Sequence, residues 1–234
     1  MRLNILLQLS RWADRLALCA FVAVCGCAHA KLSHVDARHH HGHATPEAFA
    51  RYAASMDKPE RDAWQQPDAL VAALGLRAGD VIADVGAGTG YFTFRLARAV
   101  GPTGKVLALD VDDRFFAILR GRSERDAYPQ VELRKIPTDA PGLRDAEVDV
   151  VFICNTYHHL EDRPGWLKKL RAALKPGGRV VNVDFKDGSL PVGPPAAHKV
   201  PEKAVVAELS RAGFQYVNAP MQLKYQYVQV FIVR

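Results

Sequence analysis

The chain has 234 residues, enough for one sizeable α/β domain with a short extension, and its formal net charge is +6. Hydrophobic residues make up 49% and charged residues 24% of the chain, and this ordinary globular composition excludes a wholly disordered protein. The charge is modest and no run of Lys and Arg is interleaved with aromatic residues, so we expect no nucleic-acid partner.

The first thirty residues differ in composition from the rest of the chain. Three arginines precede an apolar stretch at 16–26, which has the length of a signal-peptide core. Ala28-His29-Ala30 fits a signal cleavage site, and Cys27 lies in a sequence that loosely resembles a lipoprotein cleavage box. We therefore predict a leader at 1–30 that exports the chain to the periplasm or associates it with a membrane. The alternative is an apolar helix or a misassigned start on a cytoplasmic protein.

A histidine-rich tract follows the leader. Residues 31–44 include His39, His40, His41 and His43. Such a tract can bind metal, but no second cluster of ligands with matching spacing lies near it in the sequence. We therefore predict a solvated linker and no metal site.

Two helical patterns precede the first predicted strand. Thr45, Pro46 and Glu47 are typical of a helix start and lead into a helix at 48–55. A second pattern runs over 59–74, with a new helical segment starting after Pro67. We predict that 45–78 forms a helical lid on a domain that spans 45–234.

Strands and helices then alternate to the end of the chain. The predicted strands are 81–85, 105–111, 131–136, 148–154, 179–185, 214–217 and 228–233, and the helices after residue 90 are 91–100, 113–121, 163–174 and 201–212. The stretch at 148–154 is apolar apart from Asp149, as expected of a strand covered on both faces. This alternation predicts a Rossmann-like, doubly wound α/β sheet of seven strands.

The link between the strand at 81–85 and the helix after it carries three alternating glycines, Gly86, Gly88 and Gly90. Glycines allow positive φ and a close approach of backbone N–H groups to a ligand. A dinucleotide loop has the spacing Gly-x-Gly-x-x-Gly, whereas this loop has Gly-x-Gly-x-Gly, and Asp84 stands two residues before it. A carboxylate there disfavours a pyrophosphate and suits a cationic ligand.

Residues 84–90 (Asp-Val-Gly-Ala-Gly-Thr-Gly) strongly resemble motif I of the class I S-adenosylmethionine-dependent methyltransferases. The resemblance extends over about 48–234 and implies a mostly parallel sheet with an antiparallel last strand. It also implies that S-adenosylmethionine is the cofactor. A structural glycine turn, a divergent dinucleotide site and a nicotinamide oxidoreductase are the alternatives, and the glycine spacing disfavours the last two.

The resemblance implies roles for residues at the strand ends, where ligands bind in open α/β sheets. Asp84 and the glycine loop would hold the methionine part of the cofactor, Asp110 the ribose hydroxyls, and Asp139 the adenine. Asp112 competes with Asp110 but suits the start of the next helix better, and Asp139 also suits a simple turn. The predicted cofactor-binding residues are Asp84, Gly86, Ala87, Gly88, Gly90, Asp110, Val111, Asp139, Ala140 and Asn155.

Residues 155–160 (Asn-Thr-Tyr-His-His-Leu) follow the strand at 148–154 and resemble motif IV of small-metabolite methyltransferases. In the family this motif faces the transferred methyl group, and a histidine can take a proton from a substrate at neutral pH. We predict His158, His159 and Tyr157 as the catalytic candidates. Only one of the two histidines can readily point inward, and packing on the following helix is the alternative role for either.

The predicted function is methyl transfer to a small-molecule or lipid-like acceptor, and a leader that reaches a membrane favours a lipid or quinone-type acceptor. An exported location conflicts with a donor that is made in the cytosol. Two rival hypotheses follow. One is an exported, non-catalytic binding protein on this fold, and the other is a protein or nucleic-acid methyltransferase, which the modest charge disfavours.

Overall fold

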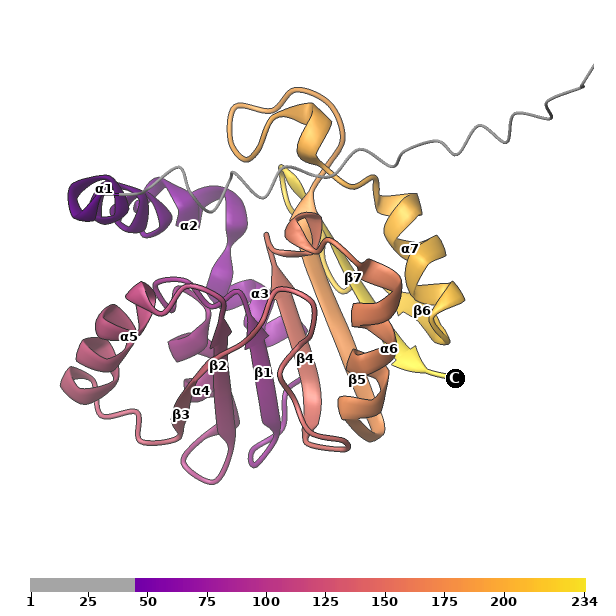
Figure 1. Ribbon diagram of the computed structural model, residues 1–234, viewed down its shortest axis with the longest axis horizontal. Coiled ribbons are helices and arrows are strands. Elements are labelled where there is room, and N and C mark those ends of the chain that lie inside the picture. The colour runs from indigo at the N-terminus through magenta and orange to yellow at the C-terminus, as the bar shows by residue number, and fades with distance from the viewer. Residues whose placement is uncertain (1–44) are drawn as a thin grey trace, which may run out of the picture. The chain divides into compact units, whose positions relative to one another are not determined.

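The computed structural model describes residues 45–234 (Figure 1). Its centre is a seven-stranded sheet with the strand order β3-β2-β1-β4-β5-β7-β6. The strands are β1 (Val81–Val85), β2 (Lys105–Asp110), β3 (Val131–Lys135), β4 (Val148–Cys154), β5 (Leu174–Phe185), β6 (Phe214–Asn218) and β7 (Gln226–Val233). β7 is antiparallel to both of its neighbours, whereas β1 to β5 pair in parallel. The predicted sheet, with its antiparallel last strand, is confirmed.

Helices cover both faces of the sheet. They are α1 (Pro46–Met56), α2 (Glu60–Gln65), α3 (Pro67–Ala73), α4 (Thr93–Val100), α5 (Arg114–Arg125), α6 (Arg163–Ala173) and α7 (Glu202–Arg211), with short 3-10 turns η2 (Tyr157–His159) and η3 (Ala196–His198). Successive strand residues face opposite sides, so Ile82 packs in the cluster that includes α3 and α4, and Ala83 in the one that includes α6 and α7. This explains why the central strands are apolar almost throughout.

The strand register brings the carboxyl ends of the central strands to one edge. Val85 pairs with Leu109 of β2 and with Ile153 of β4, and Cys154 pairs with Val183 of β5. The loops that follow β1, β2 and β4 therefore start at the same level. This edge is where ligands bind in open α/β sheets.

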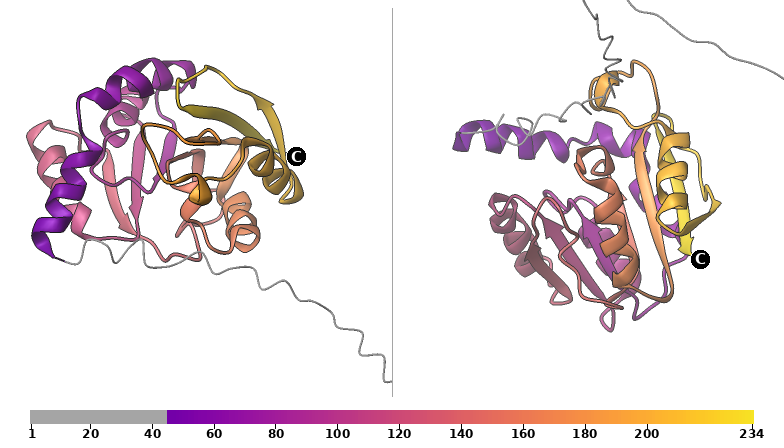
Figure 2. Two further views of the ribbon diagram at one scale, coloured as in Figure 1. Left: turned by 90° about the horizontal axis from the view of Figure 1, so that it is seen from above. Right: turned by 45° about the vertical axis from the view of Figure 1, so that its right-hand side comes forward.

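The two N-terminal helices lie across this carboxyl edge. Figures 1 and 2 show α1 and α2 above the strand ends, apart from the helices that cover the sheet faces. Arg122 of α5 links the end of α1 to the glycine loop. Its guanidinium donates to the carboxylate of Asp57 at 2.9 Å and to the carbonyl of Thr89 at 2.8 Å. Of the segment predicted as a lid, α1 and α2 therefore lie beside the glycine loop, whereas α3 packs with α4 on one face of the sheet.

Several boundaries differ from the sequence-based prediction; for example, α5 continues to Arg125 instead of ending at 121, and β7 begins at Gln226 instead of 228. β5 begins at Leu174 instead of 179, because Leu174 already pairs with Val148 ahead of an irregularity in the ladder. The helix after the glycine loop begins at Thr93, two residues late, since the loop itself takes up Tyr91 and Phe92.

The leader at 1–30 and the histidine tract at 31–44 lie outside the described residues and stay predictions. Within residues 45–234, no helix combines the length and apolar character needed to cross a bilayer.

Candidate functional site

The glycine loop turns sharply between β1 and α4. Gly86, Gly88 and Gly90 have φ angles of 71°, 53° and 87°, a region that side chains rarely adopt. A Cβ atom on Gly86 would lie 2.2 Å from Oγ1 of Thr156, in the loop after β4. The N–H groups of Gly86 and Ala87 donate to the carbonyl of Leu109 at 2.8 and 3.0 Å. The loop is therefore packed tightly between the ends of β2 and β4.

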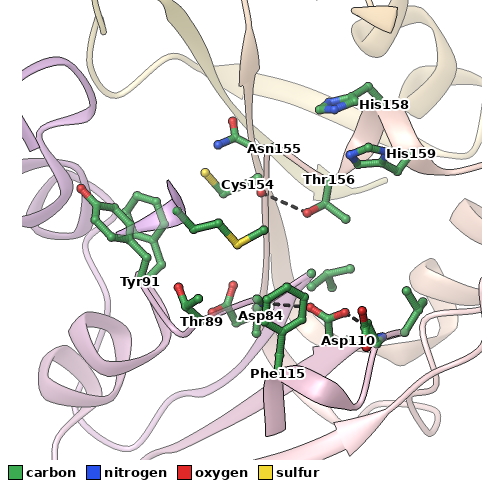
Figure 3. Close-up of a pocket in the computed structure, with 18 of the residues that line it drawn as sticks. Asp84, Thr89, Tyr91, Asp110, Phe115, Cys154, Asn155, Thr156, His158 and His159 are labelled. Atoms are coloured by element: carbon green, nitrogen blue, oxygen red, sulfur yellow. Dashed lines mark hydrogen bonds between the residues drawn. The ribbon is translucent and has the colours of Figure 1, made fainter. Parts of the chain in front are cut away.

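A cavity of about 460 Å³ opens beside this loop, at the carboxyl edge of the sheet (Figure 3). Its size is in the range of small-ligand pockets. The glycine loop and the end of β2 line one side, and the loop after β4 lines another. Helices α1 and α2 contribute Tyr52, Met56, Arg61 and Trp64. Residues from segments that are far apart in the sequence thus meet in one cavity.

Asp110 lies at the end of β2 and is 6% exposed. Its carboxylate accepts hydrogen bonds from the backbone N–H groups of Gly88, at 2.8 Å, and Asp112, at 3.0 Å. Burial raises the pKa of Asp110, and these backbone donors partly offset the rise. The side chain is therefore held in one orientation at the cavity wall.

Asp84 is the last polar residue of β1 and is 3% exposed. The hydroxyl of Thr93 donates to its carboxylate at 2.6 Å. Burial raises the pKa of Asp84 to about 7, although the Thr93 hydroxyl and the positive charge of Arg61 act in the opposite direction. A cationic group placed beside Asp84 would favour its ionised form.

His158 is paired with a buried carboxylate. Its Nδ1 lies 2.9 Å from both carboxylate oxygens of Asp184, and Asp184 also accepts from the N–H of Phe185 at 2.8 Å. Asp184 is 1% exposed and stands near the end of β5. A carboxylate at Nδ1 places the ring proton there and leaves Nε2 as the basic nitrogen. This pair is the arrangement expected of an oriented general base.

His159 also lines the cavity, and its ring centroid lies 4.2 Å from that of His158. Unlike His158, it is exposed. The structure therefore gives the two predicted histidines different surroundings: His158 is buried and bonds to a buried acid, whereas His159 is exposed.

The cavity brings together most of the residues that the sequence predicted for the site. Those that line it are Asp84, Gly86, Ala87, Gly88, Asp110, Val111, Asn155, His158 and His159. Gly90, the last glycine of the loop, does not line the cavity. An added Cβ there would meet the side chains of Leu119 and Phe94.

Besides Gly90, three other predicted residues do not line the cavity. The hydroxyl of Tyr157 donates to Glu208 of α7 at 2.6 Å, because the 3-10 turn after β4 directs this side chain into the core beneath α7. Asp139 is exposed and lies 3.5 Å from the ammonium of Lys169. Ala140 is also absent from the lining, and the preceding residues Pro137 and Thr138 take its place.

Sequence reasoning missed Asp184 as the partner of His158. The same signal that identified Asp84 and Asp110, an acidic residue at the end of an apolar strand, also applies to Asp184. The aromatic and apolar wall was also missed, since none of its residues is among the predicted site residues. It consists of Tyr52, Met56, Trp64, Tyr91, Phe115, Trp166 and Phe185.

No group of three His, Cys, Asp or Glu side chains within residues 45–234 is arranged to hold a metal ion.

The chain is similar to known methyltransferases. A methyltransferase-domain sequence model matches residues 83–180. A demethylmenaquinone methyltransferase of Lactococcus lactis is 32% identical over 151 residues, which cover 62% of this chain and 60% of that protein. A ubiquinone/menaquinone biosynthesis C-methyltransferase of Hahella chejuensis is 29% identical over 119 residues, which cover 50% of this chain and 48% of that protein. The chain thus spans about half to three-fifths of the length of these relatives.

The fold is also similar to a solved structure. The crystal structure of an S-adenosylmethionine-dependent methyltransferase from Aquifex aeolicus superposes with a TM-score of 0.74 at 26% identity. The match covers 79% of this chain and 98% of that one. The similarity therefore extends over most of this chain and nearly all of that structure.

Proposed function

Because the chain belongs to the class I S-adenosylmethionine-dependent methyltransferases, we propose that it transfers a methyl group from that donor to a small, lipid-like acceptor of the quinol type. The relatives from Lactococcus lactis and Hahella chejuensis, named for menaquinone and ubiquinone methylation, support this acceptor class. The observation that carries the proposal is that His158, which lines the same cavity as the glycine loop, is paired with the buried Asp184 behind it.

The residues of the cavity fit S-adenosylmethionine. Asp84 is a buried carboxylate beside the glycine loop and suits the donor's ammonium, while Asp110 suits a pair of hydroxyl donors. Phe115 and Ile136 provide an apolar surface for a flat base. When bound, the donor supplies an electrophilic methyl group on its sulfonium.

The chain's own task is then to exclude water, to position the acceptor and to remove a proton. Nε2 of His158 accepts the proton from the acceptor hydroxyl or carbon, and Asp184 stabilises the resulting imidazolium. Trp64 and Phe185, whose ring centroids are 6.0 Å apart, line the same cavity with Leu160. These side chains suit an apolar ring system.

The proposal is tested by incubating the full chain with tritiated S-adenosylmethionine and 1,4-naphthoquinol kept reduced by dithionite. We expect label in the organic phase, and product mass raised by one methylene. Donor binding without transfer to this probe or to longer isoprenoid quinols would instead support the non-catalytic binding protein. Label recovered in added tRNA or protein would support the other rival.

Replacement of Asp110 by alanine is expected to weaken donor binding by about 1–3 kcal/mol, the scale for losing a charged hydrogen-bond partner. The loss has two sources, since Asp110 also holds the N–H of Gly88. Isothermal titration with S-adenosylmethionine measures it. Replacement of the exposed Asp126 by alanine is the control, and equal affinities for the two variants would contradict the role of Asp110.

The raised pKa of Asp84 predicts that donor affinity increases with pH. Protons and the donor's ammonium compete for this carboxylate, so with a pKa of about 7 the association constant is expected to rise about tenfold from pH 6 to pH 8. Without donor, the free energy of unfolding is expected to change in the opposite direction. The folded state holds the Asp84 proton more tightly than the unfolded state does, so the stabilisation from this proton is lost as the pH rises through 7. Titration calorimetry of the wild type and Asp84→Asn at both pH values tests this, because the variant retains only the donor's own titration.

A further inference from the structure

Three amide side chains connect helix α2 to the loop after β4. Gln65 lies at the end of α2, Gln226 at the start of β7, and Asn155 directly after β4. Nε2 of Gln65 donates to Oε1 of Gln226 at 2.8 Å, and Nε2 of Gln226 donates to Oδ1 of Asn155. Both glutamines are 0% exposed. In a buried chain of amide side chains, any donor or acceptor left unpaired destabilises the protein, so we expect all of these hydrogen bonds to be formed.

Arg61 determines the direction of the chain. Its Nε donates to Oε1 of Gln65 at 2.5 Å, and its guanidinium is held by the carbonyl of Met56 at 2.6 Å and by the ring of Tyr91, 3.7 Å away. Because a guanidinium has no acceptor, the atom of Gln65 that faces it must be the oxygen. The nitrogen of Gln65 must then face Gln226, and each following amide is oriented in turn.

The last amide of the chain has one group left over. Asn155 uses its oxygen for Gln226, and no side chain or carbonyl within residues 45–234 accepts from its Nδ2. Asn155 lines the cavity across from Asp84 and Asp110 (Figure 3), close in sequence to the predicted base His158. Its backbone is fixed at a φ of 56°, with its N–H bonded to the carbonyl of Val183 at 2.9 Å.

We propose that Nδ2 of Asn155 is a specificity-determining donor that binds an oxygen of the acceptor substrate, and that Arg61 fixes its orientation through Gln65 and Gln226. This inference rests on the proposed function. A fixed N–H donor selects a carbonyl, hydroxyl or phenolate oxygen over a hydrocarbon of the same shape, since a lost partner leaves the amide unpaired. Gln65 and Gln226 are positioning residues, which act only through Asn155.

Replacement of Gln65 by glutamate should reverse the donor-to-acceptor direction of the hydrogen bonds between the three side chains. The introduced carboxylate would keep the bond to Arg61 as an ion pair, and its second oxygen would face Gln226 as an acceptor. Gln226 would turn its nitrogen toward position 65 and its oxygen toward Asn155. Asn155 would then donate to Gln226 and present its own oxygen to the cavity, where it repels another acceptor.

The probes are 1-tetralone, a bicyclic ketone, and tetralin, which has the same rings without oxygen. Equilibrium dialysis of the full chain with S-adenosylhomocysteine should give tighter binding of 1-tetralone in the wild type. In Gln65→Glu the affinity for 1-tetralone is expected to fall about tenfold, while that for tetralin stays the same. Gln215→Glu, which adds the same charge on the exposed side of β6, is the control and should keep the wild-type preference.

Asn155→Asp provides a second variant should Gln65→Glu fail to fold. It keeps an acceptor for Gln226 and replaces only the cavity-facing nitrogen by oxygen, so it should give the same loss for 1-tetralone. Equal losses for both probes, no loss for either, or a fall in donor affinity alone would overturn the inference. A wild type that prefers 1-tetralone but transfers no methyl group to quinols would contradict the proposed function and leave this inference intact.

Discussion

Replacement of His158 by glutamine is expected to lower the rate of methyl transfer by about 10²- to 10⁴-fold, the range for losing a general base. The side chain of glutamine keeps a polar group near Asp184 but cannot accept a proton at neutral pH. Because Asp84 and Asp110 bind the donor in this account, donor affinity should stay within about twofold of the wild-type value. Single-turnover transfer from tritiated donor measures the rate, and titration calorimetry measures the affinity.

His159→Gln is the matched comparison, since the two rings lie side by side. The rate of methyl transfer is expected to fall less than about tenfold in this variant, because the Asp184 carboxylate bonds to the ring of His158. Asp184→Asn should approach the loss seen for His158→Gln, since a neutral amide no longer fixes the proton at Nδ1. A larger loss for His159→Gln than for His158→Gln would assign the base to the other ring.

Replacement of Gly86 by alanine is expected to have the second large effect. The new methyl group would lie 2.2 Å from Oγ1 and 2.7 Å from Cγ2 of Thr156, so the glycine loop or the end of β4 must move. Positive φ adds strain of about 1–2 kcal/mol, and the forced contact adds about 1–3 kcal/mol. Together they should lower the free energy of unfolding by about 2–5 kcal/mol and donor affinity by about 100-fold, since loop geometry sets the binding site.

Gly75→Ala separates the two causes. Gly75, which follows α3, also has a positive φ, 59°, but an added Cβ there would meet nothing within 4 Å. We expect this variant to lose only the strain contribution to the free energy of unfolding and to bind the donor normally. Urea denaturation and titration calorimetry of both variants provide the test. Equal losses of donor affinity would show that Gly86 acts through backbone strain alone.

The sheet was predictable because its pattern is local. Apolar runs of strand length, broken by glycine and proline, located the strands to within a few residues. The positions of Asp84 and Asp110 in the cavity also follow, because an acidic residue that ends a parallel strand lies at the ligand-binding edge.

The predicted site residues that lie outside the cavity are those whose side-chain orientation is decided by tertiary contacts. The 3-10 turn at 157–159 directs Tyr157 toward Glu208 and leaves His158 at the cavity, and periodicity cannot distinguish these directions. Asp139 lies one residue beyond the lining residue Thr138, and its neighbour Lys169 is far away in the sequence.

The hydrogen-bonded chain of Gln65, Gln226 and Asn155 is still harder to predict from the sequence. Gln65 and Gln226 are 161 residues apart, and each looks like an ordinary polar residue at the end of its element. Only their burial and their shared hydrogen bond distinguish them from solvated glutamines. The pairing of His158 with Asp184, 26 residues away, needed the strand register in the same way.

A crystal structure with S-adenosylhomocysteine tests the central claim most directly. We predict the ribose hydroxyls on Asp110, the amino group beside Asp84, and the homocysteine sulfur facing the side of the cavity that holds Asn155 and His158. A nucleoside bound elsewhere, or a cavity in which neither carboxylate touches the ligand, would contradict the claim.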